Sequence, residues 1–175
     1  MTFSKRLLLG VAAAALMTSG AQAADLLLPA NQIYDSPLFD FEGFYVGGTA
    51  GAGAFPGPGG SGMVGVVVGA NFAITDALLT GVEFQGDALW NGGGLYGFNA
   101  LFLGKLGGYL SDDMLVYGTA GGGWIASTPS YGIGAGIEMA VAPQFSVRGE
   151  GMITGAWGGG ITGGKITAGL LWHLD

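Results

Sequence analysis

The stretch Val82-Glu83-Phe84-Gln85-Gly86-Asp87-Ala88-Leu89-Trp90 decides the fold of this 175-residue chain. Its even-numbered side chains are apolar, whereas positions 83, 85 and 87 carry Glu, Gln and Asp. Successive side chains of a β-strand point to opposite faces, so a period of two predicts a strand with one apolar and one polar face.

The same alternation recurs along the chain after residue 42. We expect eight strands, at residues 43–54, 62–74, 78–90, 95–110, 114–125, 131–141, 145–156 and 165–174. Each is about 10–16 residues long, which exceeds the ~5–6 residues of a typical soluble strand and is close to the ~9–11 that cross a tilted bilayer. Alternation alone also fits a soluble secreted β domain with one wet face.

The connections between these strands favour a membrane barrel. Alternate connections are short and contain Asp, Ser or Pro, at residues 74–77, 110–113 and 141–144; we call this side the turn end. The others are somewhat longer and richer in glycine, at residues 55–61, 91–94, 126–130 and 157–164; we call this side the loop end. Short turns on one side and longer loops on the other are typical of outer-membrane barrels.

Aromatic residues gather near both ends of the predicted strands, as membrane-interface girdles do. The turn-end group is Phe44, Tyr45, Phe72, Tyr109, Tyr117, Phe145 and Trp172. The loop-end group is Phe55, Trp90, Tyr96, Phe98, Trp124, Tyr131 and Trp157.

Composition excludes several other classes of protein. The chain has 38 glycines, 50% hydrophobic residues, no cysteine, and five Lys and Arg against twelve Asp and Glu. Six prolines are too few for collagen, and the apolar content is too high for intrinsic disorder. Disulfide scaffolds are excluded by the lack of cysteine, and an acidic balance argues against nucleic-acid binding.

The first segment has the pattern of a secretory signal peptide. Lys5 and Arg6 precede an apolar run at 7–17, and Ala21-Gln22-Ala23 provides a small-residue cleavage site. The run is too short for the ~20 residues of a spanning helix. We therefore predict a cleaved signal peptide at 1–23, a polar, irregular periplasmic lead at 24–42, and a barrel at 43–175 with both termini in the periplasm.

Several segments resemble the small porin-like outer-membrane β-barrel proteins of Gram-negative bacteria, whose architecture is that of the OmpA-type eight-stranded barrels. They are residues 43–48 (GFYVGG), 104–110 (GKLGGYL), 116–122 (VYGTAGG), 132–138 (GIGAGIE) and 167–174 (TAGLLWHL). The last is similar to the signal read by the barrel-insertion machinery, through Gly169, Trp172 and Leu174, although such chains usually end in an aromatic residue. The resemblance implies an outer-membrane location, a structural or porin-like role and no catalytic residues.

We therefore expect an all-β protein, an eight-stranded antiparallel up-and-down transmembrane β-barrel. Its polar parity then faces the lumen. Buried charges persist when they are paired, so we predict a lumen charge network of Glu83, Asp87, Lys105, Glu138, Arg148 and Glu150. Such a network either stabilises a plugged barrel or lines an ion path. Eight-stranded barrels are usually filled by side chains, which favours the plug, while inward glycines such as Gly69 and Gly136 leave room for water.

No catalytic, cofactor-binding or metal site is expected. Two matches to G-x-G-x-x-G, at 57–62 and 92–97, do not open a helix after a strand. His173, the only histidine, has inward parity and no serine near it in sequence.

The expected function is a structural, envelope-integrity role in the outer membrane, with narrow porin-like permeation of small solutes as an addition. The expected partners are outer-membrane lipid and, during biogenesis, periplasmic chaperones and the barrel-insertion machinery; nucleic acid is not among them. Two alternatives stay open, a surface adhesion or interaction protein and a lipid-modifying barrel enzyme.

Overall fold

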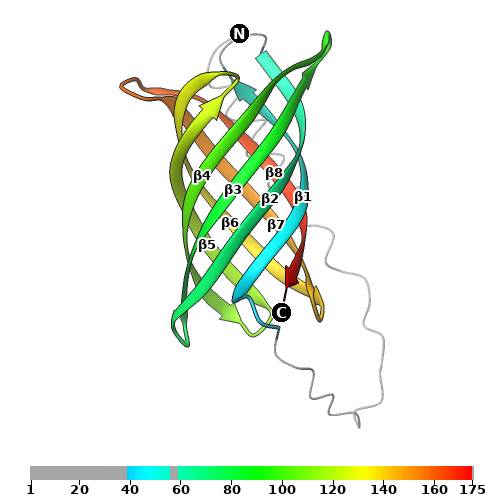
Figure 1. The fold of residues 1–175 in the computed structure, drawn as a ribbon, viewed down its shortest axis with the longest axis vertical. Helices are drawn as coiled ribbons and strands as arrows, with labels where there is room; N and C mark the ends of the chain where they lie inside the picture. The colour runs from blue at the N-terminus through cyan, green and yellow to red at the C-terminus, as the bar shows by residue number, and fades with distance from the viewer. Residues whose placement is uncertain (1–38, 56–58, 175) are drawn as a thin grey trace. The chain divides into compact units, whose positions relative to one another are not determined.

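Eight antiparallel strands form a closed barrel in a computed structural model that describes residues 39–55 and 59–174 (Figure 1). The strands are β1 Gly43–Phe55, β2 Gly59–Thr75, β3 Leu78–Asn91, β4 Gly94–Ser111, β5 Met114–Ile125, β6 Thr128–Ala142, β7 Phe145–Ala156 and β8 Ile161–Leu174. Each strand pairs with its neighbour in sequence, and β8 pairs with β1 to close the ring. The predicted fold class is confirmed. The signal peptide predicted at 1–23 lies outside the described residues.

Strands extend further into the loop end than the sequence predicts. β2, β6 and β8 begin at residues 59, 128 and 161, whereas glycine, proline and threonine around these positions predicted loops. Backbone pairing between neighbouring strands outweighs the low strand propensity of these residues. The pairing continues to the strand ends, as in Phe55 opposite Gly59 and Ile125 opposite Thr128.

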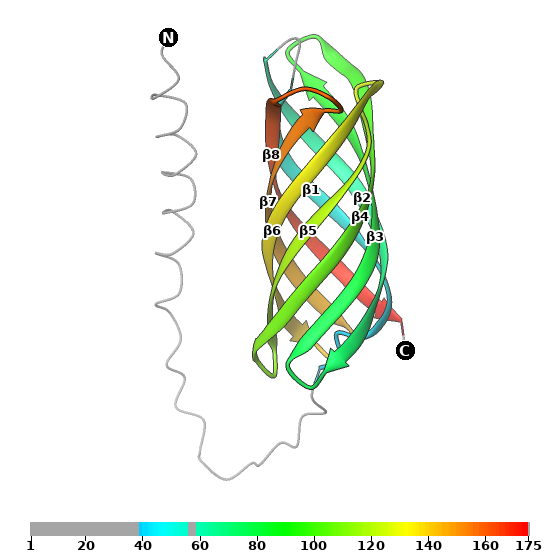
Figure 2. The same cartoon turned by 90° about the vertical axis from the view of Figure 1, so that its left-hand side faces the viewer.

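The connections consequently differ little between the two ends (Figure 2). At the turn end they are residues 76–77, 112–113 and 143–144; at the loop end the described ones are 92–93, 126–127 and 157–160. The expectation of somewhat longer loop-end connections is therefore wrong for 92–93 and 126–127, which have two residues like those at the turn end, and correct for 157–160, which has four. At 126–127 both residues have positive φ, 45° at Ala126 and 74° at Ser127, as a type I′ hairpin turn requires.

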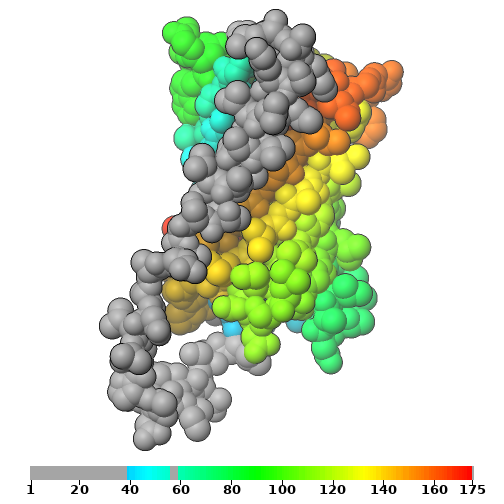
Figure 3. Space-filling model, turned by 180° about the vertical axis from the view of Figure 1, so that it is seen from behind, coloured from blue at the N-terminus to red at the C-terminus, as the bar shows by residue number. Residues whose placement is uncertain are grey.

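The outer wall of the barrel is apolar along its whole height. Large hydrophobic side chains of the predicted outward parity are exposed there, among them Val64, Val82, Phe102, Ile133 and Leu170. The strands cross this wall diagonally as parallel bands (Figure 3). Only contact with lipid makes such a surface favourable, and a closed barrel leaves no strand edge unpaired, so the fold is a transmembrane barrel. The described residues contain no helix that is long and apolar enough to cross a membrane.

Outward-facing aromatics occur at both ends of the wall, but the groups are smaller than predicted. Exposed members are Phe44, Phe72, Phe145 and Trp172 near the turn end, and Trp90, Phe98, Trp124 and Trp157 near the loop end. Tyr45, Tyr117 and Phe55 are instead buried inside the barrel. These residues were assigned to the girdles from their height along the strand, but their side chains have the parity that faces the lumen.

Apolar layers fill both ends of the lumen. Near the loop end the layer consists of Phe55, Met63, Leu89, Leu101, Leu103, Ile125 and Met152. Near the turn end it consists of Phe41, Leu79, Leu115 and Tyr117, with Phe39 and Tyr109 against it. Phe41 belongs to the segment predicted as a polar, irregular lead; residues 39–42 are irregular, but the Phe41 side chain is buried in the barrel. Between the two layers lies a polar layer.

Candidate functional site: the charged interior

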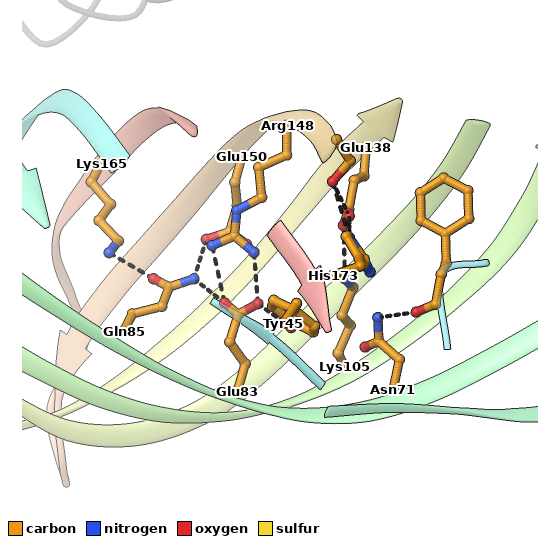
Figure 4. Close-up of polar contacts among 12 residues, drawn as sticks. Tyr45, Asn71, Glu83, Gln85, Lys105, Glu138, Arg148, Glu150, Lys165 and His173 are labelled. Atoms are coloured by element: carbon orange, nitrogen blue, oxygen red, sulfur yellow. Dashed lines mark hydrogen bonds and ion pairs between the residues drawn. The ribbon is translucent and has the colours of Figure 1, made fainter. Parts of the chain in front are cut away.

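The structure places all six residues of the predicted lumen network inside the barrel. Each is at most 4% exposed. β3 contributes Glu83 and Asp87, β4 Lys105, β6 Glu138, and β7 Arg148 and Glu150, each with a side chain that points inward because its parity is opposite to that of the lipid-facing residues. The six residues belong to two clusters, and Figure 4 labels all of them except Asp87.

Glu83 and Arg148 form the centre of the first cluster, here the Glu83 cluster. Arg148 Nη1 lies 2.6 Å from Glu83 Oε2 and Nη2 lies 3.1 Å from Oε1, a two-pronged pairing that suits the planar guanidinium. β3 and β7 lie on opposite sides of the eight-stranded ring, so this ion pair spans the lumen. Gln85 extends the cluster by donating to Glu83 (2.6 Å) and Glu150 (2.9 Å).

Lys165 completes the Glu83 cluster at its loop-end side. Its Nζ donates to Asp87 Oδ2 and to Gln85 Oε1, each at 2.7 Å. The predicted network omitted Lys165 and Gln85, although the parity of both residues is inward. Parity alone would have been enough to include both residues in the predicted network.

Glu138 organises the second cluster, here the Glu138 cluster, nearer the turn end. Its Oε2 accepts from Lys105 Nζ at 3.0 Å, while Oε1 accepts from Ser146 Oγ at 2.7 Å and lies 3.0 Å from His173 Nε2. Four strands, β4, β6, β7 and β8, therefore meet at one carboxylate.

Tyr45 on β1 joins the two clusters. Its hydroxyl donates to Glu83 Oε2 at 2.5 Å, and its ring stacks on the His173 ring with centroids 5.5 Å apart. Lys105 Nζ lies 5.1 Å from the centre of the Tyr45 ring and 4.4 Å from that of Tyr117. The two rings thus surround a buried ammonium that has a single carboxylate partner.

Inward glycines make room for these rings. Gly69 lies opposite Tyr45 in the β1–β2 register, and Gly136 lies opposite Tyr117 in the β5–β6 register. A Cβ on Gly136 would lie 2.5 Å from the Tyr117 hydroxyl, and one on Gly69 would overlap the Tyr45 ring. At these two positions side chains occupy the space that the sequence suggested for water.

Among the described residues, Glu150 is the one carboxylate inside the lumen without a salt bridge. Lys105, Arg148 and Lys165 each bind another acid within 4.0 Å, and the bond from Gln85 is the one hydrogen bond that Glu150 makes. Its Oε2 is buried without a protein partner. Other buried atoms share this property, including Tyr117 Oη and Thr119 Oγ1. Such atoms are commonly satisfied by ordered water.

Ser146 lies beside His173 in space although not in sequence. Its Oγ is 3.1 Å from His173 Nε2, so the expectation that no serine lies near this histidine holds for the sequence only. The arrangement differs from a hydrolase triad, in which the acid binds the other ring nitrogen. Here Glu138 meets the same Nε2, Nδ1 has no hydrogen-bond partner, and Ser146 is fully buried.

The three residues predicted as an insertion signal lie on β8. Trp172 and Leu174 face outward near the turn end, and the Trp172 ring stacks on Phe145 of β7 at 6.4 Å. Gly169 faces inward, where an added Cβ would lie 3.0 Å from Thr49.

Comparisons with known proteins identify similar folds. No protein-family model and no curated protein matches the chain. The barrel is similar to a solved structure from work on de novo design of transmembrane β-barrels, with 21% identity over 77% of this chain and 98% of that one and a TM-score of 0.46.

The chain is also similar to solved structures of two natural proteins. One is the outer membrane protein Ail of Yersinia pestis, at 11% identity, covering 73% of this chain and 97% of that one with a TM-score of 0.47. The other is Neisserial surface protein A, at 12% identity, covering 76% and 98% with a TM-score of 0.43. At these identities the similarity concerns the fold and not the role.

Proposed function

We propose that this protein is a non-conducting outer-membrane barrel with a structural role in the cell envelope. The observation that carries the proposal is the filled interior. Two apolar layers enclose a polar layer whose centre is the Arg148–Glu83 pair across the lumen. A lumen occupied in this way offers no continuous water path, so the narrow permeation expected from sequence is not part of the proposal.

We place the turn end in the periplasm because both ends of an exported eight-stranded barrel lie on that side. Described acids outside the lumen lie at that end: Asp40, Glu42, Asp76, Asp112 and Asp113. The loop-end connections 92–93, 126–127 and 157–160 carry no charge. Short, uncharged connections offer little to a protein partner, which argues against an adhesion role. Export through a cleaved signal peptide at 1–23 is part of the proposal.

We assign no enzymatic activity to the barrel. Ser146 and His173 are buried, and Glu138 lies at the same histidine nitrogen, Nε2, that a triad would leave to the serine. Expression should therefore leave the mass spectrum of lipid A unchanged, and a new lipid A species would contradict this assignment.

The experiment that tests the structural role is deletion and complementation in the native bacterium. Loss of the gene should increase sensitivity to detergents and large antibiotics, and the intact gene should restore resistance. A variant that weakens the lumen, Arg148→Ala, should restore it less well than the lipid-facing variant Ile133→Ala at equal membrane abundance. Unchanged sensitivity in the deletion strain would overturn the proposed role.

A further inference from the structure

Residues 39–42 enter the barrel at its turn end. Phe41 is fully buried and packs against Leu79, Leu115 and Tyr117, while Phe39 lies at the rim beside it. Asp40 and Glu42 alternate with the two rings and are exposed. The segment has the alternation of a strand, yet it precedes β1 and fills the mouth of the barrel.

Specific contacts hold this segment in place. The carbonyl oxygen of Phe41 accepts from Asn71 Nδ2 at 2.8 Å, and both groups are buried. Phe39 meets the ring of His173 edge-on with centroids 4.8 Å apart, and Phe41 meets it at 6.0 Å and 90°. The two rings therefore cover the Glu138 cluster on its turn-end side.

Like charges oppose this docking. A cleft of about 310 Å³ at the rim is lined by Phe39 and Glu42 together with Asp76 and Asp112 of the neighbouring turns. Asp113 lies beside Asp112, and all three cations of the described residues are inside the lumen. Exposed carboxylates that crowd one rim repel each other, and dissolved ions screen that repulsion within about 10 Å at 0.1 M salt.

We propose that residues 39–42 form a plug that closes the turn end, shields His173 from solvent, and docks more firmly as cation concentration rises. Burial of the two rings and the Asn71 bond favour the docked state. Repulsion among the rim carboxylates favours release. The balance between them makes the mouth of the barrel sensitive to ionic conditions, although the loop-end layer still blocks passage.

His173 provides a direct test because it is the only histidine of the chain. Diethyl pyrocarbonate acylates neutral imidazole that solvent can reach, so its rate of reaction with the untagged full-length protein in detergent reports release of the plug. The wild type should react slowly. Phe41→Ala should react at least about tenfold faster, because truncating a buried Phe weakens its docking.

Two controls separate plug release from unfolding. Phe41→Leu keeps an apolar side chain in the layer and should stay protected, and Phe98→Ala removes an exposed loop-end ring and should match the wild type. All variants must keep the heat-dependent gel shift of a folded barrel. A fast reaction of the wild type, or a protected His173 in the folded double variant Phe39→Ala/Phe41→Ala, would overturn the plug.

The ionic dependence is tested with the same reaction. Raising NaCl from about 10 to 500 mM at constant pH should slow acylation of wild-type His173 severalfold, relative to N-acetylhistidine in the same buffers. Glu42→Gln/Asp112→Asn should react slowly at both concentrations because less repulsion remains to be screened. An equal salt effect in this variant, or none in the wild type, would overturn the role of the rim carboxylates.

Discussion

Arg148 and Glu83 connect opposite walls of the barrel through two hydrogen bonds of 2.6 and 3.1 Å, with both side chains essentially inaccessible to water. Around this pair, every strand from β1 to β8 contributes at least one inward side chain to the layers that fill the lumen. The interior is therefore part of the barrel's stability as well as the barrier to conduction.

Removing both partners of this pair should destabilise the barrel by less than the sum of the two single removals. Arg148→Met leaves Glu83 buried without its cation, and Glu83→Gln leaves the guanidinium without a carboxylate; each should lower the free energy of unfolding by about 3–5 kcal/mol. The double variant should lose clearly less than the sum. Urea unfolding in detergent micelles measures the coupling, and strict additivity would show that the pair makes no direct interaction.

Substitution at Gly69 should be far more costly than at an outward glycine. A Cβ at Gly69 would overlap the Tyr45 ring, whereas one at Gly151 on the lipid-facing wall would meet nothing within 4 Å. We expect Gly69→Ala to cost about 1–3 kcal/mol and Gly151→Ala to be neutral or stabilising. Combining Gly69→Ala with Tyr45→Leu should recover part of the loss, and equal effects at both glycines would contradict the ring–glycine packing.

Substitutions in the turn at Ala126-Ser127 should stabilise the barrel. Both residues hold positive φ, which costs an ordinary side chain roughly 1–2 kcal/mol, whereas Asn-Gly suits such a turn. Ala126→Asn/Ser127→Gly should therefore raise the unfolding free energy by about 1–2 kcal/mol. The same exchange at Asp112-Asp113, where φ is not positive, should give no such gain; a loss at 126–127 would refute the turn type.

Trp172 should matter for assembly beyond its contribution as an interfacial aromatic. It lies in the segment proposed as the insertion signal, and Trp124 is a similarly exposed tryptophan near the loop end. Trp172→Asn should reduce the fraction of heat-modifiable barrel in outer membranes, whereas Trp124→Asn should have a smaller effect. Equal fractions for the two variants would remove the basis for a signal at Gly169, Trp172 and Leu174.

Much of the fold follows from parity in the sequence. The alternation around Glu83 predicts both the strand and the inward direction of its charges, because a closed barrel has one lipid-facing and one lumen-facing side. Parity does not tell which inward side chains of different strands meet. Ser146 and His173, for example, come together through the β7–β8 register, and Arg148 meets Glu83 across the ring.

Other features escaped prediction for different physical reasons. Phe39 and Phe41 alternate with acids, but four residues before the first strand are too few to distinguish a buried plug from a loop. The glycine-rich loop-end segments have poor strand propensity, and only the continuing ladder makes them strands. Tyr45 and Tyr117 lie at the height of the girdles along their strands, which is why they are predicted there. The glycines opposite them, Gly69 and Gly136, indicate instead that both rings pack inside the barrel.

Single-channel recording in planar lipid bilayers tests the filled lumen most directly. The purified wild-type barrel should insert without conductance steps at up to about 100 mV in 1 M KCl, under conditions in which a known porin gives discrete steps. Reproducible steps from the wild type that are absent from detergent-only controls would contradict a lumen closed by the Arg148–Glu83 layer and its two apolar neighbours.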